Sequence, residues 1–548
     1  MKASAAFTAR WLAEVLCTFA FTLLFAVIVA DAQQPVMTSH VPDAVASGVA
    51  PSLGGLPGER RLSLALSLPL RDEAELDDLL QNLYDPQSPN YHNYLSTEEF
   101  TERFGATEAD YAAVIRFAES NGLRVIDKPA NRMVLNVEGT VASIEGAFHI
   151  TLELFQHPTE NRTFYAPNRE PSVDLDVPVL HISGLDNFSP PRAKNTMSVE
   201  TVSSAAGSGP GGSFLGSDLR AAYYGSGPLN GAGQSVGIFA MAGYQVSDID
   251  LYFRNAHQPR NVPIRGVSLN GASLTCPPSS CNDVEQSLDI EQAISMAPGL
   301  SQLVVYVGKQ NVSILNQMAA DNTSKQLSCS YGWADNQSSV DPIFKEMAAQ
   351  GQTIFVATGD QGSSTPAGVV WPSDDPWVTA VGGTDLTIAS AGGAWTSETG
   401  WVNSAGMPSK NRVPIPSYQQ MAGVVTSANH ASATLRNIPD VASESDARNY
   451  VCAMGICKEH GAGTSYAAPL WASFIAMVNQ QAAANGKAPI GFLNPALYTI
   501  GTGSNYTFDI HDIRSGTNGA YSAVTGYDLV TGWGSPKGAN LINALNRR

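Results

Sequence analysis

The first part of the chain carries alternating strand and helix patterns. Leucine recurs at every second position from Leu62 to Leu68, which is the period of a strand with one buried face. Ser96 and Glu99 form a capping-box pattern at the start of a helix. The further predicted elements are helices over 73–83, 107–122 and 141–147 and strands over 123–126, 133–137 and 151–155. This β-α-β-β-α-β order predicts an α+β unit of the ferredoxin-like type.

The second part of the chain alternates short apolar runs with helical segments. The predicted strands cover 236–241, 303–307, 326–330, 353–358 and 378–381, and the predicted helices cover 247–256, 284–297, 314–320, 342–350 and 470–478. Such alternation is typical of a mostly parallel sheet flanked by helices. Residues 191–212 are rich in Pro, Ser, Ala and Gly, which predicts a flexible, cleavable linker. We therefore expect domains over 43–190 and 213–548.

The N-terminus has the pattern of a secretory signal peptide over residues 1–32. Lys2 and Arg10 precede an apolar run over 15–30, and the run ends in Ala30-Asp31-Ala32. An uncleaved membrane anchor is the alternative, but the run is short for a span of about 20 residues. We expect a cleaved signal, a secreted, extracellular protein and no stable membrane association after signal removal.

Composition agrees with export and excludes one class of partner. The chain has 31 basic and 49 acidic residues, so its formal net charge is −18. A chain this acidic repels phosphate backbones, and we expect no nucleic-acid binding. Only 15% of the residues are charged, against roughly 25% in an average protein. A chain with so few charges loses little when acid neutralises its carboxylates, which favours an acid-tolerant protein.

The cysteines predict two small disulfide loops. Cys276–Cys281 and Cys452–Cys457 each stand five positions apart in turn-like stretches, as in exported proteins with loop-closing disulfides. Cys329 lies in an apolar strand and is expected to be a buried thiol. A zinc site is the alternative interpretation, but the sequence offers no His or Cys partners at ligand spacing.

One serine stands where a nucleophile is expected. Gly463-Thr464-Ser465 leads directly into an apolar helix, so Ser465 lies on a tight turn near N–H groups that favour developing negative charge. The alternative is a simple N-cap serine. A nucleophilic serine needs a base, usually a histidine. His460 is too close in sequence to accept the Ser465 proton, and no other histidine of this part stands in a recognisable catalytic setting. The base should therefore be a carboxylate.

Three acidic residues are candidates for this chemistry. Glu285 and Asp289 are four apart in a predicted helix, so both project from one face, and they are expected to share a proton. Asp283 and Glu291 are expected to form a solvated acidic face of the same helix. Asp360 directly follows the predicted strand 353–358, at the end of the sheet where α/β proteins build their sites, although an ordinary Asx turn is the alternative.

Together these motifs resemble the sedolisin family, the serine-carboxyl peptidases, and its kumamolisin-like members in particular. Its serine motif is matched by Gly463-Thr464-Ser465, its Glu-x-x-x-Asp helix by Glu285 and Asp289, and its oxyanion aspartate by Gly359-Asp360-x-Gly362. The resemblance covers nearly the whole chain after the signal. It implies a subtilisin-like α/β domain preceded by an α+β ferredoxin-like activation prodomain, which acts as an intramolecular inhibitor.

The resemblance also implies roles. Ser465 is the nucleophile, Glu285 takes its proton, and Asp289 orients Glu285 and shares that proton. Asp360, protonated in acid, donates a hydrogen bond to the tetrahedral oxyanion. The implied enzyme is a secreted, acid-active endopeptidase that cleaves proteins and peptides through an acyl-enzyme and is made as a self-processing zymogen.

The family pattern further implies one structural Ca²⁺ near the C-terminus. The implied ligands are the carboxylates of Asp512 and Asp528 and the carbonyls of Ile513, Val524 and Gly526. An ordinary Gly-rich turn is the alternative. Two positions depart from the pattern of some members: Ala240 replaces a glutamate, and Tyr331 stands where a tryptophan is found.

Other functions remain as alternatives. A tripeptidyl-peptidase of the same family would use the same motifs. An inactive secreted binding protein would be expected to have lost one of the four catalytic positions, and none is lost. A histidine-dependent subtilase needs a His motif that is absent, and a small-molecule hydrolase would ordinarily show Gly-x-Ser-x-Gly, which Ser465 does not.

Overall fold

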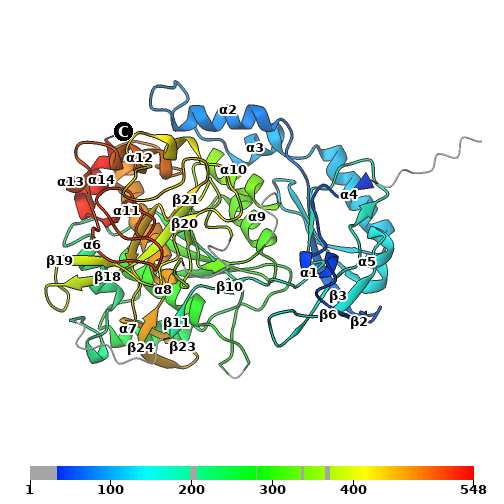
Figure 1. Cartoon of the computed structure of the whole chain (residues 1–548), viewed down its shortest axis with the longest axis horizontal. Coiled ribbons are helices and arrows are strands. Elements are labelled where there is room, and N and C mark those ends of the chain that lie inside the picture. Colours follow the sequence, from blue (N-terminus) through cyan, green and yellow to red (C-terminus); the bar gives the residue numbers. More distant parts are fainter. Residues whose placement is uncertain (1–33, 198–205, 279, 335–338, 364–370, 548) are drawn as a thin grey trace, which may run out of the picture.

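The computed structural model describes residues 34–197, 206–278, 280–334, 339–363 and 371–547. The predicted signal peptide (1–32) and residues 198–205 of the predicted linker lie outside the described residues. Figure 1 shows an N-terminal unit, in blue and cyan on the right, beside a larger C-terminal unit, coloured green to red. Within the described part of the chain, no helix is both long and apolar enough to cross a membrane.

The N-terminal unit is built on a four-stranded antiparallel sheet. Its strand order is β4-β5-β3-β9, with bounds β3 Arg61–Ser67, β4 Arg124–Asp127, β5 Val134–Thr140 and β9 His181–Ser183. This is the ferredoxin-like order, as predicted. The last strand, however, is β9 and not the predicted 151–155. The latter segment forms β6 (Leu152–Gln156), which pairs with β2 (Ser52–Gly55) and β7 (Thr163–Pro167) in a separate sheet. All three residues of β9 are buried, so this strand has no alternation for sequence analysis to detect.

Two helices of this unit begin where predicted capping residues stand. Its helices are α1 Asp43–Ala46, α2 Glu73–Tyr84, α3 Thr97–Phe104, α4 Glu108–Ser120 and α5 Val141–Phe148. Ser96 Oγ accepts from the Glu99 amide at 3.1 Å, and the Glu99 carboxylate accepts from the Ser96 amide at 2.8 Å. Both halves of the capping box are therefore formed. Thr107 caps α4 in the same way, through the Asp110 amide.

The C-terminal unit contains the predicted, mostly parallel sheet. Its order is β13-β14-β12-β15-β17-β18-β19, β22 also pairs with β18, and β19 alone of these strands runs antiparallel to its neighbour. The bounds are β12 Ser235–Ala240, β13 Ile264–Ser268, β14 Gln302–Val307, β15 Gln326–Cys329, β17 Thr353–Ala357, β18 Thr379–Ile388, β19 Trp395–Gly400 and β22 Val441–Glu444. β15 and β17 are parallel neighbours, so the residues that follow them, Ser330 and Asp360, lie at the same edge of the sheet.

Two long helices bring the candidate site together. α11 (Thr464–Ala484) lies against β15, β17, β18 and β22, and it is almost entirely buried over its first four turns. α8 (Val284–Met296) packs directly on α11, and every residue after Val284 is buried. A helix that is buried on all sides can be largely apolar, as α11 is from Ala467 to Val478. The other helices of this unit are α6 Gly216–Tyr223, α7 Val246–Asn255, α9 Asn311–Asp321, α10 Asp341–Ala349, α12 Asn494–Gly501, α13 Tyr506–Asp509 and α14 Gly538–Asn546.

The N-terminal unit docks on α9 and α10 of the C-terminal unit. α2 packs on α10, while α3 and β5 pack on α9 (Figure 1). The Tyr84 hydroxyl donates to the Ala348 carbonyl at 2.6 Å, and the Leu95 amide donates to the Ala349 carbonyl at 3.0 Å. The Asn131 amide side chain donates to the buried Glu346 carboxylate at 2.7 Å. The interface therefore contains specific polar contacts in addition to its apolar packing.

Candidate active site

Ser465 is fully buried in the first turn of α11. Gly463, two residues before Ser465, has φ +138°, a backbone conformation that residues with a side chain rarely adopt. A Cβ at this position would lie 2.5 Å from the Lys194 carbonyl oxygen and 2.8 Å from Asp360 Oδ2. Both the backbone conformation and the lack of space therefore require glycine at position 463. The Lys194 carbonyl oxygen and Asp360 Oδ2 both lie close to this glycine, near Ser465.

The acidic pair on α8 faces this serine. Glu285 is 3% exposed and Asp289 is fully buried. Asp289 Oδ1 accepts from the Ser330 hydroxyl at 2.7 Å, and Glu285 Oε2 accepts from the Asn195 side chain at 2.5 Å. Burial raises the pKa of Glu285, and hydrogen bonding from Asn195 and Ser465 offsets part of the rise. Burial, together with the charge of Glu285, raises the pKa of Asp289 well above its ordinary value. Two such groups favour a singly protonated pair.

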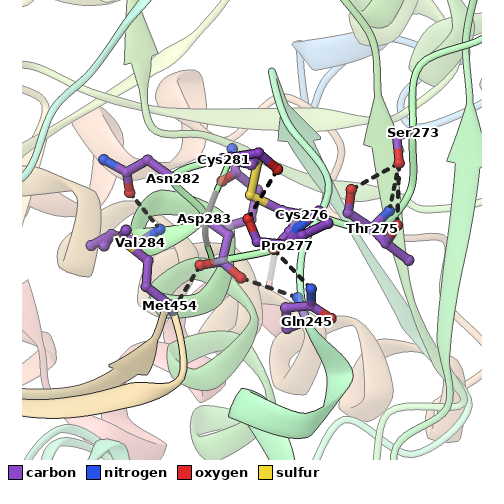
Figure 2. Close-up of a disulfide and its surroundings, with 12 residues drawn as sticks. Gln245, Ser273, Thr275, Cys276, Pro277, Cys281, Asn282, Asp283, Val284 and Met454 are labelled. Carbon is purple, nitrogen blue, oxygen red and sulfur yellow. Dashed lines mark hydrogen bonds between the residues drawn. A yellow bond between two sulfur atoms is a disulfide. The ribbon is translucent and has the colours of Figure 1, made fainter.

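The other two acidic residues of this helix are buried as well, so the predicted solvated face is wrong. Glu291 accepts from the Cys452 amide at 3.2 Å. Asp283, at the start of α8, accepts from the amides of Gln245 at 3.1 Å and Met454 at 3.0 Å (Figure 2). Both carboxylates therefore join α8 to neighbouring loops and fix the helix that carries the pair.

A disulfide lies close to each of these two carboxylates, Asp283 and Glu291. Cys276 is bonded to Cys281 in the loop just before α8, as Figure 2 shows. Cys452 is bonded to Cys457 across the hairpin of β23 (Asn449–Ala453) and β24 (Ile456–Ala462). Cys329 is a free, buried thiol. The two small loops thus brace the segments that hold α8.

Asp360 lies near Ser465, beyond the end of β17. Its Oδ1 accepts from the Thr464 amide at 2.8 Å and from the Thr464 hydroxyl at 3.0 Å. Its buried Oδ2 has no hydrogen-bond partner among the described residues. Burial raises the pKa of Asp360 to about 7, although the bonds from Thr464 oppose the rise. At acidic pH, Asp360 therefore carries a proton that Oδ2 can donate.

The predicted linker runs through this site as an extended strand. β10 (Arg192–Ala193) pairs antiparallel with β16 (Tyr331–Gly332), and β11 (Thr196–Met197) pairs antiparallel with Gly461 and Ala462 of β24. The Lys194 amide donates to the Ser330 carbonyl at 2.9 Å. The Lys194 carbonyl oxygen accepts from the Ser465 amide at 3.2 Å and lies 2.5 Å from Ser465 Oγ. Residues 192–197 of the predicted linker are therefore held by both neighbouring segments of the site.

Sequence analysis predicted the four acidic and nucleophilic residues but missed their supporting contacts. Ser330, Thr464 and Asn195 hold Asp289, Asp360 and Glu285, and none was singled out for such a role. Tyr331, a departure from the family pattern, is buried, and its hydroxyl accepts from Gln286 on α8. Ala240 is buried at the end of β12. The only advance signal for Ser330 and Thr464 was their position beside a predicted strand end or helix start.

The C-terminal loop brings two further carboxylates together. The Gly526 amide donates to Asp512 Oδ1 at 3.0 Å, and the Val524 amide donates to Asp528 Oδ2 at 3.0 Å. Asp528 is fully buried, and burial raises its pKa to about 7. Arg514 pairs with Asp512 Oδ2 at 2.6 Å. Over the described ranges, no group of three or more His, Cys, Asp or Glu side chains is placed to hold a metal ion.

Comparison with known proteins agrees with this arrangement. Residues 51–188 match the family described as Pro-kumamolisin, activation domain. Kumamolisin of Bacillus sp. (strain MN-32) is 30% identical over 532 residues, which cover 90% of this chain and 93% of kumamolisin. Tripeptidyl-peptidase 1 of Mus musculus is 27% identical, with 90% of this chain and 93% of that protein covered.

A solved structure supports the same conclusion. Pseudomonas sedolisin, a serine-carboxyl proteinase complexed with two molecules of pseudo-iodotyrostatin, aligns with a TM-score of 0.54 and 25% identity, over 63% of this chain and 99% of that one. Fold and relatives together define a serine-type peptidase with a subtilisin-like domain and an N-terminal activation domain. The chain belongs to the sedolisin family of serine-carboxyl peptidases.

Proposed function

We propose that the protein is a secreted, acid-active endopeptidase, made as a zymogen that processes itself. The observation that carries the proposal is the arrangement around the Lys194–Asn195 peptide: Ser465 contacts the Lys194 carbonyl oxygen, Asp360 Oδ2 lies near that oxygen, and Glu285 contacts both Ser465 and Asn195. Asp289 lies on the same helix and interacts with the charge of Glu285. In this proposal residues 1–32 are the signal peptide, 43–190 the prodomain, 191–212 the linker and 213–548 the peptidase domain. Proteins and peptides are the substrates.

The geometry supports a two-step acyl transfer. Ser465 Oγ attacks a carbonyl carbon placed as that of Lys194 is, while Glu285 accepts the hydroxyl proton. Asp289 shares one proton with Glu285, so that Glu285 can accept the proton of Ser465. The developing oxyanion lies next to the Ser465 amide and Asp360 Oδ2, and protonated Asp360 donates to it. Glu285 then protonates the leaving amine, and water hydrolyses the acyl-enzyme.

Acid activity follows from the same groups. An ionised Asp360 would place a carboxylate beside the oxyanion and would raise the barrier, whereas the protonated acid lowers it. The proton on Asp360 is lost as pH rises through about 7. We therefore expect activity below neutral pH and a loss of activity above it.

The path of the linker favours an endopeptidase over a tripeptidyl-peptidase. The chain continues on both sides of the Lys194 carbonyl, through β10 toward the N-terminal unit and through β11 on the other side. A site that holds an internal segment of the chain in this way does not require a free N-terminus three residues away. The tripeptidyl-peptidase alternative instead predicts release of tripeptides from unblocked N-termini.

We further propose that one structural Ca²⁺ binds at the C-terminal loop. The carboxylates of Asp512 and Asp528 lie against the same 524–528 backbone, and such hard oxygen donors suit this ion. The carbonyls of Ile513, Val524 and Gly526 would supply further ligands, because too few acidic side chains gather there. The ion would stabilise the ionised, buried Asp528 and thereby the fold around it.

The decisive experiment is self-processing of the purified precursor. Incubated at pH 3–5 without other proteases, the wild-type chain should shorten at the linker, whereas Ser465→Ala should fold but stay full-length. Circular dichroism verifies the fold of the variant, and intact mass spectrometry follows processing. Wild-type maturation rates in Ser465→Ala would refute the proposal, and would instead favour an inactive binding protein cut by a contaminant.

A further inference from the structure

The side chain of Lys194 is buried against residues that have no role in the proposed cleavage reaction. Lys194 is 6% exposed, and its Nζ donates to the Ala357 carbonyl at 2.5 Å. Its aliphatic stem passes over Gly359, where an added Cβ would stand 3.9 Å from the lysine Cδ and 3.7 Å from Ala405. We call Ala357 and Gly359, together with Ala405 on the other side of Gly359, the lysine site.

The lysine site accommodates a straight, four-carbon chain and presents a carbonyl acceptor to the amine at its end. Burial lowers the pKa of Lys194 to about 8, and the nearby acidic groups Asp360, Asp374 and Glu285 oppose the fall. The ammonium therefore keeps its charge at acidic pH. Asp374 is held by Ser409 at 2.6 Å and by Asn411 at 3.1 Å, and it has no part in the proposed reaction. It thus supplies acidic character to this region without taking part in bond cleavage.

The backbone of the same residue is placed for cleavage. β10 and the bond from the Lys194 amide to Ser330 fix the residues before the carbonyl, while β11 fixes those after it. Asn195, on the leaving-group side, touches Glu285, the group proposed to protonate the leaving amine. The bond between residues 194 and 195 is accordingly the bond presented to Ser465.

We infer that Lys194–Asn195 is the first bond the precursor cuts, and that the lysine site makes the mature enzyme select lysine on the acyl side of the bond it cleaves. This inference rests on the proposed function. The Ser465 Oγ bond to the Lys194 carbonyl carbon forms while the bond to the Asn195 nitrogen breaks. The Ser465 proton passes through Glu285 to that nitrogen. Water then releases the Lys194 carboxylate, so the sum is a hydrolysis.

A lysine replaced by a neutral side chain leaves the Ala357 carbonyl without its donor. Sites built around a hydrogen bond discriminate more strongly than apolar pockets, which typically distinguish by about 10–200-fold. We expect prodomain-free enzyme to cleave the linker peptide Pro-Pro-Arg-Ala-Lys-Asn-Thr-Met (residues 190–197) at least about tenfold faster, in kcat/KM, than the same peptide with norleucine for lysine. Norleucine keeps the stem and removes only the ammonium.

The precursor provides the second readout. In a time course at acidic pH, the earliest new N-terminus should be Asn195, and Lys194→Gln should slow its appearance at least about tenfold. Arg169→Gln is the matched control, because it removes one positive charge from an exposed position of the N-terminal unit. It should process at the wild-type rate.

The outcomes separate this inference from the proposed function. A first Ser465-dependent cut at another bond, or equal rates for the lysine and norleucine peptides, would refute the inference and leave the peptidase intact. Absence of any Ser465-dependent cleavage, of precursor or peptide, would refute both. The peptide assay needs no altered precursor, so a folding defect in Lys194→Gln cannot imitate either result.

Discussion

Replacing Asp360 with asparagine tests the origin of acid activity most directly. An amide keeps a hydrogen-bond donor beside the oxyanion but cannot ionise. We expect Asp360→Asn to retain measurable activity at its optimum and to lose much less of it as pH rises. The wild-type enzyme should instead lose activity about tenfold per pH unit once Asp360 ionises.

The size of the effect follows from the burial of Asp360. A rise of the pKa from 3.8 to about 7 corresponds to roughly 4 kcal/mol in favour of the protonated form. The described site has the linker in place, and water enters once the linker leaves, so the midpoint in the mature enzyme should lie between these two values. Loss of a whole oxyanion donor costs about 10²–10³ in rate, and the amide should cost less than that.

The assay is a pH–rate profile of kcat/KM for prodomain-free wild type, Asp360→Asn and Glu285→Gln. Glu285→Gln should be inactive at every pH, because an amide cannot accept the Ser465 proton. Glu346→Gln is a matched control: it also replaces a buried carboxyl of raised pKa, but one that contacts Asn131 of the N-terminal unit. An alkaline limb with the same midpoint and slope in wild type and Asp360→Asn would refute the reasoning. A Glu285→Gln enzyme with more than a few per cent of activity would place the base elsewhere.

Two further predictions concern stability. Removing calcium with a chelator, or replacing Asp528 with alanine, should lower the melting temperature. An ion present at 100 times its Kd contributes about 2.7 kcal/mol to the free energy of unfolding. Equal melting temperatures with chelator and with excess Ca²⁺ would argue against the site. The Ser465→Ala precursor should also lose stability as pH rises. Asp360 and Glu346 have pKa values raised to about 7 and about 8 in the folded state, so their contribution is fully present below about pH 4 and is lost through this range. Calorimetry from pH 4 to 8 measures the slope, and a melting temperature that rises with pH would contradict it.

Most of the elements could be predicted from the sequence because their signals are local. The capping residues Ser96 and Thr107 start helices where expected, and the helix and strand patterns of the C-terminal unit match α7 to α10 and β12, β14, β15 and β17 within a few residues. β13 was not predicted, and β18 continues well beyond the predicted strand 378–381. β9 was not predictable in this way, since three buried residues carry no period. Its pairing with β3 depends on contacts more than a hundred positions away.

The character of α8 shows a different limit. A charged residue on a helix usually faces water, so Asp283 and Glu291 were expected to be solvated. Backbone amides from the β23–β24 hairpin donate to both of them, and these donors lie more than 160 positions further along the chain. Sequence periodicity identifies which residues share a helix face, but it does not show which loops pack against that face. The same limit hid the strand pairing of residues 192–197, at the start of the predicted linker.

The linker geometry finally raises the question of why the precursor would survive synthesis at neutral pH. The Lys194 carbonyl already lies against the nucleophile, so proximity does not protect it. In the proposed mechanism Asp360 would protect it: as pH rises above the pKa of about 7 the carboxyl ionises, and a carboxylate beside the carbonyl would repel the oxyanion that attack creates. Acidification would then restore the donor and start cleavage without moving the chain.

This reasoning gives a last prediction. The Asp360→Asn precursor should process itself slowly even at its optimum pH. However, the processing rate at pH 7.5 divided by the rate at pH 5 should be at least about tenfold higher than in the wild-type precursor, because the amide donor never ionises. Quenched time courses analysed by intact mass measure both rates, and Asp360→Asn/Ser465→Ala corrects for other proteases. If both precursors lose the same fraction of their processing rate at pH 7.5, the lack of self-processing at neutral pH comes from docking of the N-terminal unit and not from ionisation of Asp360.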